Sequence, residues 1–155
     1  MRVTIIAVGR LRAGPEKTLA DEYLKRLAWP VSLREVAENR TRDPGTRRAR
    51  ENRLLLDAVP AGARVVALDG RGRALSSEDF AARLGAWRED GVAEAAFLIG
   101  GADGLTADTL ARADLVLSLG AMTWPHLMVR AMLAEQLYRA QSILTGHPYH
   151  RGGQG

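Results

Sequence analysis

The sequence predicts an α/β fold, in which a mostly parallel sheet is covered by helices on both faces. Short apolar runs typical of strands alternate with segments of helical spacing, and no long run of consecutive strands interrupts this alternation. A helix between two strands favours a parallel sheet, because the crossover places that helix on one face. The chain has 155 residues, of which 46% are hydrophobic. We therefore expect residues 1–155 to form a single domain.

The N-terminal part predicts a strand, a helix and a second strand. Residues 3–8 form an apolar run that is too short for a signal peptide or for the roughly 20 residues that span a bilayer. Gly14-Pro15 opens a helix that runs to about Ala28, with leucines and a tyrosine on one face. Residues 31–36 alternate as a short strand.

The middle of the chain continues the alternation. A loop leads into an arginine-rich helix through Leu56, and residues 64–68 form a strand that a glycine-rich turn stops. Ser76 and Asp79 have the spacing of a weak capping box at the start of the next helix. The apolar residues 94–99 form a further strand.

The last part of the chain predicts a short helix, a strand and a long helix. The short helix follows Thr106, and residues 115–119 form the strand. Thr123 is expected to cap the long helix, with Pro125 in its first turn, where a missing N–H costs nothing. The long helix runs to Leu144 and is apolar over a wide arc, which fits a core helix and a dimer face equally well.

Small-residue turns follow three of the strands, at Asp69 to Gly72, Gly100 to Gly104 and Gly120 to Met122. Where side chains are missing, backbone N–H groups can approach a ligand. Three such turns after strands therefore favour a ligand-binding crevice at the carboxyl ends of the strands. Each turn taken alone is more often a simple tight turn. A Rossmann-type oxidoreductase is disfavoured, because the dinucleotide-binding fingerprint is missing after the first strand.

Positive charge is concentrated in one segment. The formal net charge is +4, and six of the 22 Lys and Arg residues lie between Arg40 and Arg53, opposed by Asp43 and Glu51. This pattern fits the solvated face of a helix, and it also fits a patch that contacts phosphates. The sequence leaves both interpretations open.

Cysteine and histidine limit the chemistry. The chain contains no cysteine, which excludes disulfides, thiolate zinc sites and cysteine nucleophiles and fits a reducing compartment. We therefore expect a soluble, cytoplasmic protein without a membrane segment and without a metal site. The three histidines lie near the C-terminus, and His150 and Arg151 beside Tyr149 favour contact with an anionic or planar substrate.

Several motifs in combination resemble those of one known family. The segments that carry the resemblance are Ile6 to Gly9, Glu22-Tyr23, Leu68-Asp69, Leu98 to Leu105, Leu117 to Leu119, Met122 to His126, Val129-Arg130, Glu135 to Ala140 and His147 to Arg151. They are similar to segments of the ribosomal RNA large subunit methyltransferase H family, within the SPOUT superfamily. Each motif alone is weak, but the combination is specific and runs almost from end to end.

This resemblance implies a SPOUT-type α/β fold with a C-terminal trefoil knot, an exception to the rule against threaded chains, and a homodimer. It also implies transfer of a methyl group from S-adenosylmethionine to N3 of a pseudouridine. That nucleotide lies in helix 69 of the large-subunit (23S) rRNA, within assembled 70S ribosomes. The cofactor-binding positions that it implies are Leu68, Gly100, Gly101, Leu119, Gly120, Ala121, Met122, Thr123 and Trp124.

The residues expected to hold the target base and its phosphates come from the long helix and the tail. They are His126, Arg139, Tyr149, His150 and Arg151, with Tyr149 available for stacking. The proton acceptor for N3 stays open between His150, another group and solvent. A dimer would let the tail of one subunit complete the pocket of the other. The competing class is a non-catalytic ribosome-binding module that keeps the fold and the basic surface without cofactor affinity.

Overall fold

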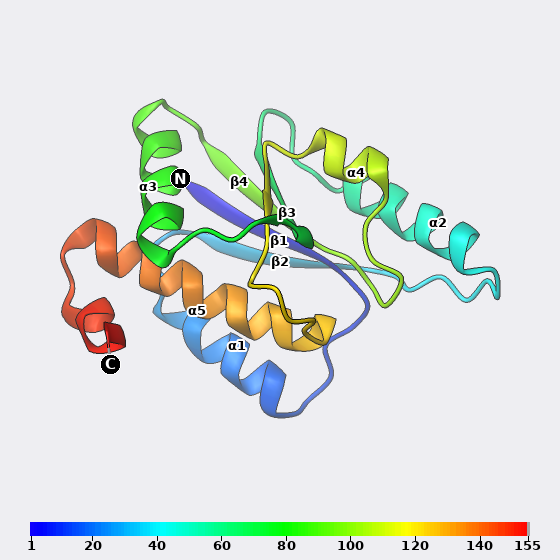
Figure 1. Cartoon of the computed structure of the whole chain (residues 1–155), viewed down its shortest axis with the longest axis horizontal. Coiled ribbons are helices and arrows are strands. Elements are labelled where there is room, and N and C mark those ends of the chain that lie inside the picture. The colour runs from blue at the N-terminus through cyan, green and yellow to red at the C-terminus, as the bar shows by residue number, and fades with distance from the viewer. Residues whose placement is uncertain (155) are drawn as a thin grey trace.

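Five parallel strands form one sheet in the computed structural model, which describes residues 1–154 (Figure 1). In chain order they are β1 (Arg2–Val8), β2 (Val31–Val36), β3 (Arg64–Arg73), β4 (Glu94–Ile99) and β5 (Leu115–Leu117). They lie in the order β2-β1-β4-β3-β5, and each neighbouring pair is parallel. The predicted α/β class is confirmed, and the knot stays a prediction with which this order is consistent. Gly155, the last residue of the expected domain, lies outside the described residues.

Helices cover both faces of the sheet. One face carries α1 (Pro15–Arg26), α3 (Ser77–Glu89) and α5 (His126–Thr145), and the other carries α2 (Pro44–Asp57) and α4 (Ala107–Arg112). α5 contacts both α1 and α3, and the final 3₁₀ helix η1 (Pro148–Gln154) packs against α5. No helix in the described part of the chain is long and apolar enough to cross a membrane.

Alternate side chains of the strands fill two separate core layers. Against α1, α3 and α5 the buried side chains include Ile5, Phe97, Leu84, Leu133 and Leu137. Against α2 and α4 they include Ile6, Leu98, Val65, Leu55 and Leu105. Neighbouring residues of β1 and of β4 therefore serve opposite layers, as the two-residue period of a strand requires.

β3 continues to Arg73, past the glycines that the sequence analysis expects to end it at Leu68. The register with β5 shifts between these two residues, and Arg73 pairs with Leu117. Gly72 makes this possible, because a Cβ at that position would overlap the backbone of Val116. The glycine here allows two backbones to approach closely instead of stopping the strand.

β5 is shorter than predicted, and α5 begins differently. Ser118 leaves the strand because its hydroxyl donates to the Gly120 carbonyl at 2.9 Å and accepts from the Gly120 N–H at 3.2 Å. Pro125, and not Thr123, occupies the N-cap position of α5, without a side-chain hydrogen bond. The Pro125 carbonyl accepts the first helical bond from Met128, so the proline lies just outside the first turn.

Other element limits agree closely with the predictions. Ser76 caps α3 by accepting a hydrogen bond from the Asp79 N–H at 3.0 Å, as their spacing predicts. α1 ends at Arg26, slightly before the expected end at Ala28.

An ion pair between the buried Arg130 and the partly exposed Glu35 joins α5 to the carboxyl ends of β1 and β2. The Arg130 side chain is 3% exposed and lies 2.5 Å from Oε2 of Glu35. Its guanidinium also donates to the backbone carbonyls of Val8 and Gly9. Partial burial opposes ionisation of Glu35, but the Leu11 N–H and the Arg130 guanidinium together hold its pKa below the ordinary value. This cluster fixes the start of α5 relative to the sheet.

Replacing Arg130 by Met should lower the free energy of unfolding by about 1.5–3 kcal/mol at pH 7, the range for hydrogen bonds to charged groups, because the Glu35 side chain is 31% exposed. Because the pKa of Glu35 is depressed in the folded state, its contribution is present at neutral pH and is lost as the pH falls below about 4.5. Urea unfolding at pH 7 and at pH 3.5 should therefore show a smaller difference between the two proteins at the acidic pH. An equal difference at both pH values would contradict this account.

Candidate functional site

A pocket of about 410 Å³ lies at the carboxyl ends of β3, β4 and β5. It collects all nine positions expected to bind the cofactor, together with one residue of the predicted catalytic group. They are Leu68, Gly100, Gly101, Leu119, Gly120, Ala121, Met122, Thr123, Trp124 and His126. The three small-residue strand exits that the sequence singles out thus meet in one place, as expected for a parallel sheet.

The first two residues of the glycine turn, Gly100 and Gly101, leave little room for a side chain. A Cβ at Gly100 would lie 3.0 Å from the Gly104 carbonyl carbon and from a methyl of Leu105. A Cβ at Gly101 would lie 3.0 Å from Oε1 of the buried Glu51. The turn closes with a hydrogen bond from the Gly104 N–H to the Gly101 carbonyl. The pocket floor is therefore bare backbone, which suits a ligand held largely by main-chain groups.

α2 holds this turn from behind. Arg47 forms two hydrogen bonds with the Asp103 carboxylate, at 2.5 and 2.9 Å, and lowers the pKa of that carboxyl. Asn52 is 2% exposed, and its amide donates to the Gly104 carbonyl at 3.1 Å. Its oxygen accepts from the Thr106 N–H at 2.9 Å and from the Thr109 hydroxyl at 2.7 Å. These contacts hold the second half of the turn, from Asp103 to Thr106.

A surface ion pair ties β3 to the same turn. The Arg71 guanidinium donates to both oxygens of Asp69, each at 2.8 Å, and also reaches the Leu105 carbonyl at 3.2 Å. The hydrogen bonds from Arg71 lower the pKa of Asp69, which lines the pocket. Two of the strand exits are thereby connected across the mouth of the pocket.

The loop between β5 and α5 forms the outer wall of the pocket. Met122 is 76% exposed and Trp124 is 39% exposed. The indole N–H of Trp124 donates to the Leu119 carbonyl at 3.3 Å, which closes the loop on itself. Gly120 has a φ of 118°, a conformation that few residues other than glycine adopt.

Three other members of the predicted catalytic group form a separate cluster on α5 and η1. The Arg139 guanidinium lies 4.9 Å from the centre of the Tyr149 ring and 3.1 Å from Nδ1 of His150. Arg139 also pairs with Glu135 at 2.6 Å, and the Tyr149 hydroxyl donates to the same carboxylate at 3.0 Å. Arg151 is exposed beside them.

The environment of this cluster shifts the pKa of Tyr149 and of the neighbouring Glu78. Burial raises the pKa of the Tyr149 phenol, as do its hydrogen bonds with Tyr23 and Glu135. The phenol is therefore neutral at physiological pH and acts as a hydrogen-bond donor. Nε2 of His150 lies 2.7 Å from Glu78 at the start of α3, and this contact lowers the pKa of Glu78. The tail thus bridges α3 and α5.

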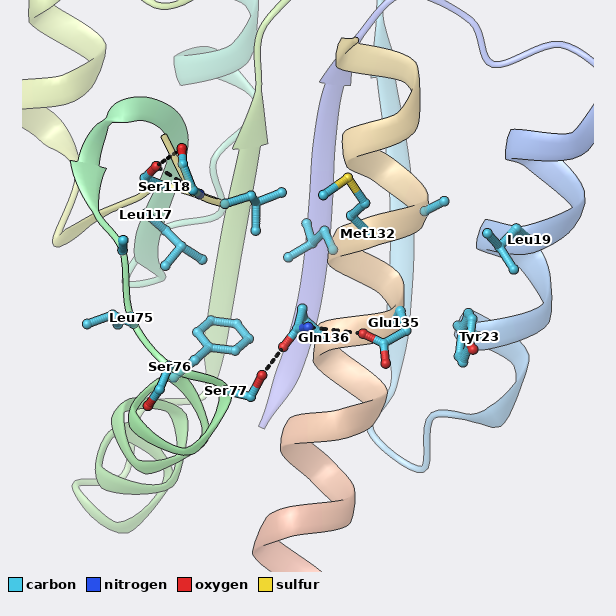
Figure 2. Close-up of a pocket in the computed structure, with 16 residues that line it drawn as sticks. Leu19, Tyr23, Leu75, Ser76, Ser77, Leu117, Ser118, Met132, Glu135 and Gln136 are labelled. Atoms are coloured by element: carbon cyan, nitrogen blue, oxygen red, sulfur yellow. Dashed lines mark hydrogen bonds between the residues drawn. The ribbon is translucent and has the colours of Figure 1, made fainter. Parts of the chain in front are cut away.

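A second pocket, of about 480 Å³, is lined by residues of α1, α3 and α5, and α5 lies between the other two helices (Figure 2). Leu19 and Tyr23 of α1 face Met132 and Glu135 of α5, and Ser77 donates a 2.8 Å hydrogen bond to Gln136. The two pockets share the lining residues Leu117, Leu119 and Gly120. Tyr149 contacts the Tyr23 and Glu135 side chains of the second pocket, and among the described side chains of η1, residues 148–151, none lines the first pocket.

The predicted catalytic group is therefore divided within one chain. His126 lines the first pocket, whereas Arg139, Tyr149 and His150 contact one another beside the second. Within residues 1–154, no group of three or more His, Cys, Asp or Glu side chains is placed to hold a metal ion.

Comparison with known proteins gives the family. Residues 1–150 match the family described as "Predicted SPOUT methyltransferase". The chain belongs to this family. It is 59% identical to the Ribosomal RNA large subunit methyltransferase H of Rhodospirillum centenum, with 97% of this chain and 99% of that protein covered. It is 57% identical to the protein of the same name from Paramagnetospirillum magneticum, over the same shares of both chains. The resemblance noted from the motifs is confirmed.

A solved structure shares the fold of this chain. A probable methylase family protein from Haemophilus influenzae superposes with a TM-score of 0.60 at 14% identity. The superposition covers 95% of this chain and 69% of that one. At this identity the likeness concerns the fold alone.

The sequence did not reveal the support that α2 gives to the glycine turn. Glu51 and Asn52 are polar, yet they lie on the same helical face as Leu55, which is fully buried. Two adjacent polar residues on the apolar face of a helix are the signal that could have revealed buried hydrogen bonding. The glycine turn that these residues support lies about fifty positions further along the chain, so spacing alone could not pair them.

Replacing Asn52 by Ala should lower the free energy of unfolding by about 1–3 kcal/mol, because buried partners in the turn lose their hydrogen bonds. Urea unfolding measures this directly, and faster amide exchange at Thr106 should accompany the loss. Arg53→Ala, at the neighbouring exposed position, is the matched control and should change stability by no more than about 0.5 kcal/mol. If the two variants were equally stable, the proposed support of the turn would be wrong.

Proposed function

We propose that this chain is an S-adenosylmethionine-dependent methyltransferase of large-subunit ribosomal RNA. The observation that carries the proposal is the single pocket that gathers all nine expected cofactor positions with His126. Membership of the SPOUT methyltransferase family and the names of the relatives support it. Residues 1–155 would form one catalytic domain.

The first pocket fits such a cofactor. Its volume lies within the range of roughly 300–1,000 Å³ that small-molecule sites occupy. When bound, S-adenosylmethionine supplies an electrophilic methyl group on a sulfonium centre. Gly100 and Gly101 leave backbone exposed to the ligand, and the loop from Leu119 to Trp124 covers its outer side. These residues hold the donor in place, so that positioning supplies much of the barrier reduction.

The finer target follows the family, and we propose N3 of a pseudouridine in helix 69 of 23S rRNA, within the assembled 70S ribosome. N3 of a uracil-like ring carries a proton that must leave during methyl transfer. Tyr149 stays protonated because its pKa is raised, so it serves as a donor or a stacking surface at neutral pH. The proton acceptor is His150, another group or solvent.

A homodimer would reunite the divided site. The tail cluster lies beside the second pocket of its own chain, as described above. Exposed apolar side chains surround the start of α5, namely Met122, Trp124, Leu127 and Met128. Exposed apolar clusters of this kind mark interaction surfaces. We propose that a second copy covers these side chains and contributes tail residues to the first pocket.

Calorimetric titration of the purified protein with S-adenosylmethionine should show saturable binding near one site per subunit. Gly101→Val should weaken that binding about tenfold or more, because the new side chain must displace Glu51 and Val8 beneath the turn. Gly70→Ala is the control, since Gly70 lines the same pocket but has open space beside it.

Absence of binding, both to the free protein and with ribosomes present, would contradict the methyltransferase and favour the non-catalytic ribosome-binding module. Binding only with ribosomes present would mean that the ribosome completes the pocket.

Replacing Arg151 by Ala should reduce methyl transfer to 70S ribosomes about tenfold or more, as expected when a charged hydrogen-bond donor is lost. The measurement is transfer of a labelled methyl group under single-turnover conditions. Arg88→Ala, an exposed arginine in the last turn of α3, is the control. Unchanged transfer by the Arg151 variant would remove the tail from the site.

A further inference from the structure

One surface carries the net positive charge of the chain. It consists of the exposed arginines of α2 and of the loop before it, which are Arg40, Arg42, Arg48, Arg50 and Arg53. The segment from Arg40 to Arg53 contains six arginines and two carboxylates, and the formal net charge of the whole chain is +4. Basic and acidic residues are therefore balanced in the rest of the chain. We call these five arginines the basic surface.

Within the described residues, neither carboxylate of this segment forms an ion pair with the basic surface. The Asp43 side chain accepts from the Thr46 N–H and caps α2, and Glu51 is buried with its Oε2 bound to the Asn39 N–H. Of the basic surface, only Arg53 has a carboxylate partner among the described residues, with Asp57 at 3.6 Å. A solvated helix face would be expected to alternate its charges, and this one does not.

Hydrogen bonds hold the loop of the basic surface in place. Arg50 donates to the Thr41 hydroxyl at 2.9 Å, and Arg47 donates to the Thr41 carbonyl at 3.2 Å. Asn39 accepts from the Thr41 N–H at 2.9 Å. Arg40 and Arg42 flank this anchored threonine and point into solvent from a fixed backbone. An ordered array of charges loses less conformational entropy on binding than a mobile one.

The basic surface begins beside the candidate pocket. Arg48 and Asp103 line one hollow, and Asp103 belongs to the glycine turn whose Gly101 and Gly104 line the pocket. Figure 1 shows the start of α2 and the preceding loop at the end of the molecule toward which the strands point. A polyanion that enters the pocket at one nucleotide would therefore pass over these arginines.

We propose that the basic surface docks the phosphate backbone of the RNA strand that flanks the target nucleotide. This inference rests on the proposed function and adds the part of the chain that binds the RNA. Guanidinium groups match phosphate geometry and release counterions when they bind it. No base needs to be read here, so the surface contributes affinity and orientation, whereas the pocket selects the nucleotide.

The test compares two triple variants for binding to 70S ribosomes over a range of salt concentrations. Arg40→Gln/Arg42→Gln/Arg48→Gln removes three charges from the basic surface. The matched control, Arg2→Gln/Arg88→Gln/Arg112→Gln, removes three exposed charges from the opposite end of the sheet. The affinity of the first variant for ribosomes should be lower by about tenfold or more. The slope of log K against log salt concentration should become less steep by about one for each phosphate contact that is lost. The control should keep the affinity and the slope of the unaltered protein.

Equal affinity and equal slope for the two variants would overturn the proposal. Calorimetry with S-adenosylmethionine should give the same affinity for both, which shows that the pocket is intact. Weak ribosome binding with normal cofactor binding therefore supports the docking surface. If the unaltered protein binds ribosomes through these arginines but transfers no methyl group, the proposed function fails while the docking surface stands. If methyl transfer proceeds and the slope does not change, the docking surface alone fails.

Discussion

The candidate site depends on one constraint: at the carboxyl edge of the parallel sheet, the backbone after β4 must turn where there is little room for side chains. Gly100 and Gly101 meet this constraint, since a Cβ at either position would press on its neighbours. Bare backbone gains no stability from packing, so other elements must hold it. Asn52 and the ion pair of Arg47 with Asp103 do so from α2. The pocket is thus shaped by an element that contributes no residue to its lining.

The strands and helices were largely predictable because each has a local signal. The run at residues 94–99 and the Ser76 cap appear in the structure as expected. Where the predicted end of a strand or helix was wrong, contacts between segments distant in sequence are mainly responsible. Gly72 ends no strand, because its missing side chain admits the backbone of Val116, and no local pattern shows that approach. Pro125 occupies the N-cap position in place of Thr123, because its carbonyl accepts the first helical bond and α5 begins at His126.

The sequence allowed both the residues of the pocket and their place in the fold to be predicted. For the tail it allowed only the residues to be predicted, and not where they lie. Three small-residue turns pointed to one edge of a parallel sheet, and the structure brings them together. The position of the tail depends on pairings such as that of His150 with Glu78, which are far apart in sequence. Arg130 illustrates the same limit, because its partner Glu35 lies on an edge strand that shows no matching pattern.

The strand order has a consequence for how the chain folds. β1 pairs with β2 soon after synthesis, but its other neighbour is β4, which follows some ninety residues later. Until β4 is made, one hydrogen-bonding edge of β1, a strand that is almost entirely buried in the folded protein, stays open. Such an edge is a template for pairing with other chains, and distant pairings form slowly. The nascent protein is therefore most exposed to aggregation in the interval before residues 94–99 leave the ribosome.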